Sequence, residues 1–260
     1  MEWSGSGADA SMMTQADGNM DDGRLSRMDR WVAMYPQLPY IAPFFTFLIL
    51  MSLSSVLPGP RYLPWLYALR TFGAGAMCVV FWRYFPRLGR AHIPWAILFG
   101  VATAGMWVGV HRWFAGQSWY PVTQVLGRDA EPSTFYDCFE QLGRGWGLWL
   151  FLVVRIGGAS VVVPIIEEIF WRGFVLRILI DYWEWDKVPL GMYTLRSFVV
   201  CSLLSAGEHP MWEVGILCWV IYNLLFYWKK SLLFLIVTHG VTNFALYAWV
   251  VWQHDWVFWS

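Results

Sequence analysis

Residues 161–176 of the chain read VVVPIIEEIFWRGFVL, an apolar run that holds the adjacent acids Glu167 and Glu168 and then Arg172. On translocon scales, an Asp, Lys or Arg at the centre of a membrane helix costs roughly 2.5 to 3.5 kcal/mol to insert. Adjacent carboxylates also repel each other, which disfavours the charged form of at least one of them. We therefore expect this cluster of charged residues to have a function.

The composition around this run indicates a polytopic membrane protein. Hydrophobic residues make up 58% of the chain and charged residues only 14%, whereas a soluble domain carries about 25% charged residues. The formal net charge is zero, so no nucleic-acid partner is suggested. The 20 Trp and 12 Tyr fit lipid-facing and interfacial packing, with a quinone or haem site as the lesser alternative. The four cysteines have no C-x-x-C spacing and are typical of core packing.

Apolar runs of about 17 to 25 residues mark the expected membrane spans. Residues 1–30 are polar and contain no such run, so we expect a disordered tail rather than a signal peptide. Residues 31–260 then form a single transmembrane helical domain. The expected spans are residues 40–57, 62–82, 93–113, 146–180, 195–209, 212–228 and 231–251, with a polar loop over about 115–144.

The run over residues 146–180 is longer than the roughly 20 residues that one upright span needs. Gly157-Gly158 and Pro164 are expected to kink it or to split it into two elements. The fold class is therefore all-α, a bundle of seven or eight transmembrane helices. Arg83, Arg87 and Arg90 in one short loop and the Lys229–Lys230 pair in another predict that both loops are cytoplasmic, which makes the N-terminus cytoplasmic as well.

Polar side chains that can do chemistry occur at three places in these apolar helices. Glu168 and Arg172 are four residues apart on one helical face, where they can form an ion pair. Glu167 points about 100° away from that face and can therefore take a different role. His209 follows Glu208 at the end of a short span. His239 and Asn243 share one face of the last span. The three other histidines, which are His92, His111 and His254, are expected to be interfacial.

Two chemistries suit these residues. In the first, Glu167 and His209 activate a water as general base, and His239 and Asn243 donate hydrogen bonds to the developing oxyanion without any metal or cofactor. In the second, His209, His239 and a glutamate bind zinc, although the sequence lacks H-E-x-x-H. A serine mechanism is weaker, because there is no G-x-S-x-G and Ser205 is one of many small helix residues.

At these residues the chain resembles the CAAX-protease and bacteriocin-processing family, also called Abi proteins. The marks of that family are E-E-x-x-x-R, then F-x-x-x-H, then H-x-x-x-N on separate membrane helices. Glu167, Glu168 and Arg172 match the first mark, and His239 with Asn243 matches the last. The middle mark fits only at His209, because Ser205 stands where Phe is expected. The resemblance covers residues 160–245, roughly a third of the chain.

The resemblance implies about eight membrane helices and a glutamate-dependent endopeptidase whose site opens to the membrane and the cytoplasm. It implies that Glu167 is the base, His209 its partner, and His239 with Asn243 the oxyanion donors, while Glu168 and Arg172 support them. The catalytic core then lies at about residues 146–250. The implied substrate is a membrane-associated peptide or protein, and the implied location is the bacterial inner membrane. The wide loop and the Trp-rich segments resemble the branch that accompanies exosortase sorting systems.

Two rivals from other classes remain. In a non-catalytic membrane protein, such as an immunity factor or a scaffold, Glu167, Glu168 and Arg172 would only hold helices together, because function depends on the site and not on the fold. A transporter or proton relay also tolerates buried carboxylates, but the chain shows no inverted repeat that would favour it.

Overall fold

A computed structural model of the protein describes residues 26–56, 63–117, 137–209 and 211–259. All regular secondary structure in these ranges is helical, so the all-α prediction is confirmed. The chain forms two compact units, residues 1–36 and residues 37–260. The first contains α1 (Arg27–Met34), whose start is closed by a capping box between Ser26 and Asp29. The expected N-terminal tail lies largely outside the described residues, and its last residues belong to α1.

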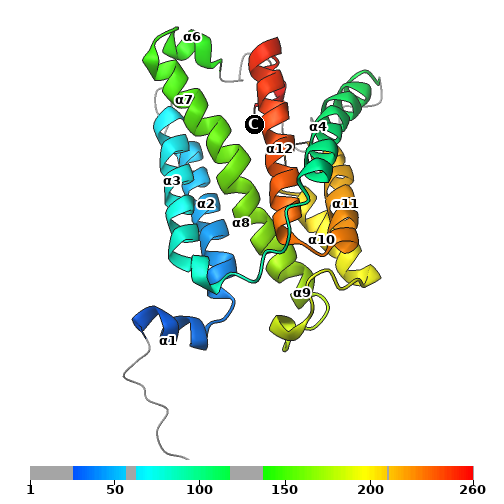
Figure 1. The fold of residues 1–260 in the computed structure, drawn as a ribbon. Coiled ribbons are helices and arrows are strands. Elements are labelled where there is room, and N and C mark those ends of the chain that lie inside the picture. Colours follow the sequence, from blue (N-terminus) through cyan, green and yellow to red (C-terminus); the bar gives the residue numbers. More distant parts are fainter. Residues whose placement is uncertain (1–25, 57–62, 118–136, 210, 260) are drawn as a thin grey trace, which may run out of the picture. The chain divides into compact units, whose positions relative to one another are not determined.

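The second unit holds the remaining helices, whose order in space is drawn in Figure 1. Their bounds are α2 Leu38–Val56, α3 Leu63–Phe81, α4 Ile93–Ala115, α6 Cys138–Leu142, α7 Trp146–Gly157, α8 Val163–Phe170, α9 Leu176–Ile178, α10 Leu195–Ala206, α11 Trp212–Lys229 and α12 Leu232–Gln253. Short 3₁₀ turns cover Trp82–Tyr84, Trp185–Lys187 and Trp256–Phe258.

Four helical stretches of the described residues are long and apolar enough to cross a membrane. They are Pro64–Tyr84, Ile93–Ala115, Trp146–Ile178 and Leu232–Gln253, and a fifth is added if residues 27–53 are taken together. The apolar helix α10 is shorter than these, with 12 residues. The protein is therefore an integral membrane protein with four to five candidate spans, fewer than the seven or eight expected.

The apolar run that was expected to kink or split forms one helical stretch of 33 residues, Trp146–Ile178. It stays continuous because two π-helical turns, η4 (Gly158–Val162) and η5 (Trp171–Val175), join α7, α8 and α9. π-turns inside α-helices are frequent at functional sites. Here they flank α8, the eight-residue helix that carries both adjacent glutamates.

Helix α12 packs against η4 and α8 on one side and against α4 on another. Figure 1 shows the long α7–α9 stretch running between the α2–α3 pair and the group formed by α12, α4 and α11. At Gly240 the backbones come so close that a Cβ atom would lie 2.5 Å from the carbonyl oxygen of Ser160. This close approach brings the middle of α12 against the start of α8.

Two loops meet at one end of the second unit. The Leu233 amide donates to the Leu88 carbonyl over 2.7 Å, and the Ser231 hydroxyl donates to the carbonyls of Leu88 and Arg90 over 3.0 and 2.8 Å. These contacts join the two basic loops that the sequence predicts to lie on one side of the membrane. The structure therefore places both loops at the same end of the bundle.

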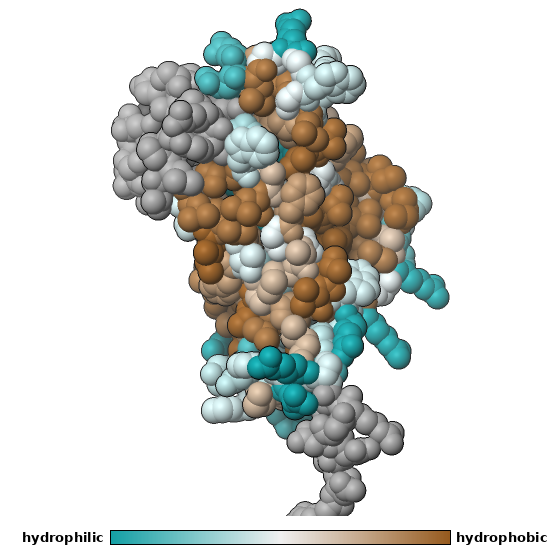
Figure 2. All heavy atoms as spheres, turned by 90° about the vertical axis from the view of Figure 1, so that its left-hand side faces the viewer, coloured by the Kyte–Doolittle hydropathy of each residue, from teal (hydrophilic) through white to brown (hydrophobic). Residues whose placement is uncertain are grey.

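Apolar side chains cover much of the outer surface. Figure 2 shows one face whose middle is covered by hydrophobic residues. The exposed fraction is 66% for Phe72 on α3, and 67% for Leu150 and 68% for Val153 on α7. Soluble proteins rarely expose contiguous apolar surface of this kind, whereas a bilayer solvates it.

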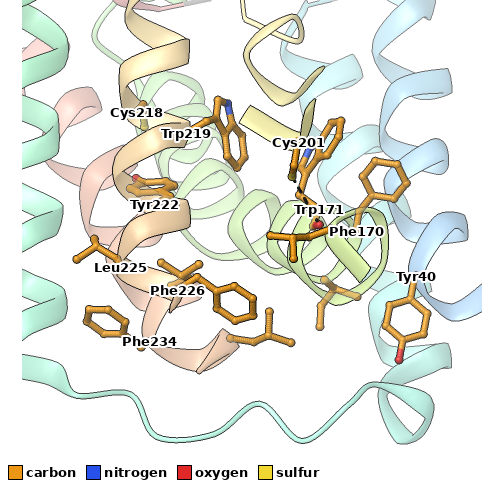
Figure 3. Close-up of a cluster of buried hydrophobic side chains, with 14 of the residues drawn as sticks. Tyr40, Phe170, Trp171, Cys201, Cys218, Trp219, Tyr222, Leu225, Phe226 and Phe234 are labelled. Atoms are coloured by element: carbon orange, nitrogen blue, oxygen red, sulfur yellow. Dashed lines mark hydrogen bonds between the residues drawn. The ribbon is translucent and has the colours of Figure 1, made fainter. Parts of the chain in front are cut away.

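A cluster of buried hydrophobic residues includes many aromatic side chains, among them Phe170 and Trp171, which follow the paired acids in the chain (Figure 3). The rings of Phe44 on α2 and Phe170 on α8 are stacked with centroids 3.9 Å apart, and Trp171 meets Phe44 edge-on. Trp219 and Tyr222 on α11 are each only 1% exposed. This core excludes water from the polar groups beside it, and the missing water strengthens electrostatic interactions among them.

Candidate active site

Glu168 and Arg172 form a fully buried ion pair within the long helix. Arg172 Nη1 lies 3.0 Å from Glu168 Oε2, and both side chains are completely inaccessible to solvent. The pairing expected from their spacing of four residues is therefore confirmed. Arg172 Nε also donates to Asn223 Oδ1 over 3.0 Å, and Asn223 Nδ2 donates to Ser202 Oγ over 2.9 Å. Hydrogen bonds thus connect the charge pair to Asn223 on α11 and, through it, to Ser202 on α10.

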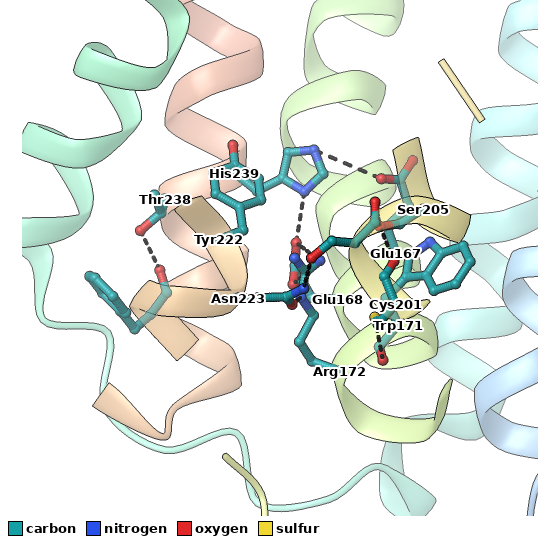
Figure 4. Close-up of polar contacts among 12 residues, drawn as sticks. Glu167, Glu168, Trp171, Arg172, Cys201, Ser205, Tyr222, Asn223, Thr238 and His239 are labelled. Atoms are coloured by element: carbon teal, nitrogen blue, oxygen red, sulfur yellow. Dashed lines mark hydrogen bonds and ion pairs between the residues drawn. The ribbon is translucent and has the colours of Figure 1, made fainter. Parts of the chain in front are cut away.

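His239 on α12 lies between the two adjacent acids (Figure 4). Its Nδ1 is 3.0 Å from Glu168 Oε1, within hydrogen-bond distance. Its Nε2 is 3.9 Å from Glu167 Oε2, too far for a direct hydrogen bond. The sequence reasoning gave Glu167 a partner in His209 only. The structure adds His239 as a neighbour of both acids, which that reasoning did not consider.

Glu167 is buried but incompletely satisfied. Its side chain is 8% exposed, and Oε2 has no hydrogen-bond partner among the described residues. An unsatisfied buried carboxylate oxygen is costly, and such groups in folded proteins call for a specific explanation. Glu167 also lines a cavity. The Glu167 side chain therefore borders a space in which a water or a polar substrate group can be held, while Oε2 itself is buried.

This cavity has a volume of about 470 Å³, within the range of ordinary ligand pockets. Glu167, His209, His239 and Asn243 all line it. The structure thus brings together the four side chains to which the sequence reasoning assigned catalysis, although they come from α8, the turn after α10, and α12. Glu208 lines the same cavity as a further carboxylate.

Aromatic rings hold the segment that carries His209. Its ring meets Trp107 edge-on at a centroid distance of 5.4 Å and lies 6.1 Å from Trp219. The preceding Glu208 accepts a hydrogen bond from Trp171 Nε1 over 3.3 Å. Ser205, which occupies the position where the resemblance expects Phe, is buried and donates to the Cys201 carbonyl over 2.6 Å. His209 therefore reaches the cavity without a Phe at that position.

Asn243 is positioned by the π-turn η4. Its Nδ2 donates to the Ala159 carbonyl over 2.8 Å. A side-chain amide carries two N–H donors, so this bond leaves one for a ligand in the cavity. The same helix is held at Thr242, which accepts from the Tyr222 hydroxyl over 2.7 Å and donates to the Gly100 carbonyl over 3.1 Å.

Sequence reasoning missed Asn223, Ser202 and the aromatic pair Trp219 and Tyr222. The Arg172 guanidinium carbon lies 4.2 Å from the Trp219 ring centroid and 5.8 Å from that of Tyr222. Asn223 offered a usable signal, because an amide in the middle of an apolar helix calls for a polar partner. The aromatic residues offered none, since they are indistinguishable from the many other Trp and Tyr residues of the chain.

Zinc was the alternative considered for this site. Within the described ranges, no group of three His, Cys, Asp or Glu side chains is arranged to hold a metal ion. His239 directs both of its ring nitrogens toward carboxylates, at 3.0 and 3.9 Å. The contacts found among these residues are therefore ion pairs and hydrogen bonds.

Residues 146–245 match the sequence profile of a family described as Rce1-like, type II CAAX prenyl endopeptidase. The match begins at the start of α7 and ends within α12, so it spans Glu167, His209, His239 and Asn243. No curated protein and no solved structure matches the chain. The family match classifies the protein as a membrane protease, and therefore as a hydrolase.

Proposed function

We propose that this membrane protease of the Rce1-like CAAX endopeptidase type is a glutamate-dependent endopeptidase that hydrolyses a peptide bond of a membrane-associated protein or peptide. The observation that carries the proposal is the position of Glu167. Its carboxylate has an unsatisfied oxygen, lines the cavity, and lies 3.9 Å from a histidine. A buried base that faces an enclosed space has the surroundings that general-base catalysis needs.

The reaction begins with a water held between Glu167 and His209. Glu167 takes a proton from this water while the water oxygen bonds to the peptide carbonyl carbon, and the carbonyl electron pair moves onto oxygen. When this oxyanion collapses, the C–N bond breaks, and the amine leaves with the proton that Glu167 returns. The products are one carboxyl and one amino terminus, so one water is consumed for each bond cut.

His239 and Asn243 are proposed to stabilise the oxyanion. Asn243 has one amide N–H beyond the bond to Ala159. His239 lines the cavity, and its Nε2 lies 3.9 Å from Glu167 Oε2. Donation from Nε2 while Nδ1 donates to Glu168 requires the doubly protonated imidazolium form of His239. Preorganised donors aimed at developing charge are among the largest contributions to catalysis, and loss of one such donor typically costs 10²–10³ in kcat.

Glu168 and Arg172 are proposed to position this machinery. His239 Nδ1 lies 3.0 Å from Glu168 Oε1. In this proposal Nδ1 donates to that carboxylate, which fixes the orientation of the ring in the way that a carboxylate orients a catalytic histidine elsewhere. Arg172 compensates the Glu168 charge in a region without water. Neither residue is among those that line the cavity.

We further propose that α2, α10 and α11 join the four established candidate spans, giving seven spans in total. The end that carries the two basic loops then faces the cytoplasm of a bacterial cell. The active site lies on the half of the long helix nearer that end, which gives a cytoplasmic substrate access to Glu167. We retain the exosortase-associated branch as the proposed subgroup on the strength of the wide loop and the many Trp residues.

The decisive experiment compares membranes from cells that produce the protein with Glu167 or with Glu167→Gln. New protein termini are mapped by mass spectrometry in both. Cleavage products are expected with the unaltered protein and are expected to fall by about 10²–10⁴-fold in Glu167→Gln, the range that a general base contributes. Glu184→Gln is the matched control, because Glu184 is exposed and pairs with Lys187 at the surface.

Equal cleavage with Glu167→Gln would overturn the mechanism. No cleavage by either form, with the Glu167→Gln protein as stable as the unaltered one, would favour the non-catalytic scaffold instead.

A further inference from the structure

Two arginines lie in the same cavity as the acid cluster but belong to neither the family marks nor the proposed mechanism. Arg70 on α3 and Arg155 on α7 both line the cavity. Their guanidinium carbons lie 3.7 and 3.8 Å from the centroid of a single ring, that of Tyr67. The distance between the two guanidinium carbons therefore cannot exceed the sum of these two distances.

Neither Arg70 nor Arg155 forms an ion pair with an acid in the parts of the chain that the structure describes. The ion pairs found there involve other residues. Arg155 is only 2% exposed. One of its nitrogens, Nη2, donates to the Trp259 carbonyl, whereas Nε and Nη1 are buried without a hydrogen-bond partner among the described residues. The Arg155 guanidinium also lies over the rings of Tyr67, Trp259 and Tyr247, at 3.8, 4.4 and 5.4 Å from their centroids, but no carboxylate among the described residues balances its charge. A buried charge without an acidic partner is expensive, and an ionisable residue in an apolar membrane helix marks a candidate binding site by default.

The cavity is therefore polarised. Glu167 and Glu208 supply negative charge on one side, and Arg70 with Arg155 supply positive charge on the other. Arg155 precedes Glu167 by twelve positions in a continuous helical stretch, so their backbone positions are about 18 Å apart along the axis. An extended peptide spans that distance with about five residues.

We propose that Arg70 and Arg155 form a subsite for a carboxylate of the substrate peptide, about five residues from the bond that is cleaved. Guanidinium groups bind carboxylates through charge-assisted and often bidentate hydrogen bonds. Repulsion by Glu167 and Glu208 directs this carboxylate away from the catalytic end. The subsite thus fixes both the direction in which the peptide lies and its register. This inference rests on the proposed proteolytic function, because the register of the peptide is defined relative to the bond that is cleaved.

The test measures binding, so that it does not depend on turnover. The full-length Glu167→Gln protein in detergent is titrated with an N-acetylated hexapeptide of Leu and Ala, either as the free acid or as the amide. The acid is expected to bind at least tenfold more tightly. Arg70→Gln on this background is expected to reduce binding of the acid to that of the amide, whereas Arg70→Lys retains part of the difference.

Arg83→Gln is the matched control. Arg83 also lies near an aromatic ring, with its guanidinium carbon 4.9 Å from the Tyr84 centroid, but it is exposed and does not line the cavity. A third peptide, amidated and ending in Glu, distinguishes the source of the carboxylate. If it binds as tightly as the acid, the subsite accepts a side-chain carboxylate, and if it binds like the amide, the subsite reads the chain terminus.

If the Glu167→Gln protein, with Arg70 unchanged, bound the acid and the amide equally, the proposal would be overturned by that result alone. So would a preference for the acid that persists in Arg70→Gln. Displacement of the acid by phosphatidylglycerol at a lower concentration than the peptide itself requires would assign the arginines to lipid instead. Because these measurements use protein without the Glu167 carboxylate, they can succeed or fail independently of proteolysis.

Discussion

His239 Nδ1 lies 3.0 Å from Glu168 Oε1, while the same carboxylate lies 3.0 Å from Arg172 through its other oxygen. Glu168 is thus shared between a histidine on α12 and an arginine one turn further along its own helix. This sharing links two tasks. The carboxylate orients the ring that faces Glu167, and it neutralises a guanidinium that has no access to water.

The first prediction follows from this double role. Glu168→Gln should lower proteolytic activity by about 10²-fold, a loss comparable to that of one oxyanion donor, because His239 loses its anionic partner. It should also destabilise the protein by about 3–5 kcal/mol, since Arg172 remains buried without a counter-charge. Activity and unfolding in SDS, followed by tryptophan fluorescence, measure the two effects separately.

The double variant Glu168→Gln with Arg172→Met separates the two roles. Removing the uncompensated guanidinium should recover much of the stability. Activity should stay low, because the ring still lacks its carboxylate. Recovery of activity together with stability would show that Glu168 serves only as a charge partner of Arg172.

How much of this site can be predicted from sequence depends on how local each contact is. The Glu168–Arg172 pair follows from helix periodicity alone, because side chains four residues apart share a face. The contact of His239 with both acids does not, since it depends on how closely α12 approaches α8. That approach depends on Gly240, which lies directly against the backbone of Ser160. The sequence does not show that these two residues are in contact.

The long helix shows the same limit. Gly157-Gly158 and Pro164 led us to expect a kink or a split, and the structure shows no split, because the helix continues through two π-turns. A π-turn adds one residue to a helical turn and leaves no periodic signature in a five-residue segment. The number of spans is also hard to predict, because hydropathy does not reveal that α10 ends after 12 residues.

The second prediction concerns metal dependence. The proposed mechanism activates water with Glu167 and His209 and draws on no metal, so proteolysis should continue after dialysis against EDTA and 1,10-phenanthroline. The measurement is the rate of product formation before and after chelation. A loss of activity that added zinc restores would support the alternative in which His209, His239 and a glutamate bind the ion.

The third prediction concerns Asn223, which accepts from Arg172 Nε and donates to Ser202. Asn223→Ala should destabilise the protein by about 1.5–3 kcal/mol, because a hydrogen bond to a charged group is lost. Ser202→Ala breaks only neutral hydrogen bonds, the one from Asn223 and the one to the Phe198 carbonyl, and should cost about 1 kcal/mol. SDS unfolding of both variants gives the comparison, and an equal or reversed order would contradict the importance of the arginine bond.

The fourth prediction concerns the close approach that assembles the site. In Gly240→Ala, the new Cβ would lie 2.5 Å from the Ser160 carbonyl oxygen, a backbone atom that cannot swing aside. Overpacking of this kind costs about 1–3 kcal/mol, and here relief requires α12 to move away from η4. His239 and Asn243 move with α12, so activity should fall as well as stability. Gly109→Ala on α4 meets nothing within 4 Å and should leave both unchanged. If Gly240→Ala lost stability yet kept full activity, the spacing between α12 and η4 would not control the geometry of the site.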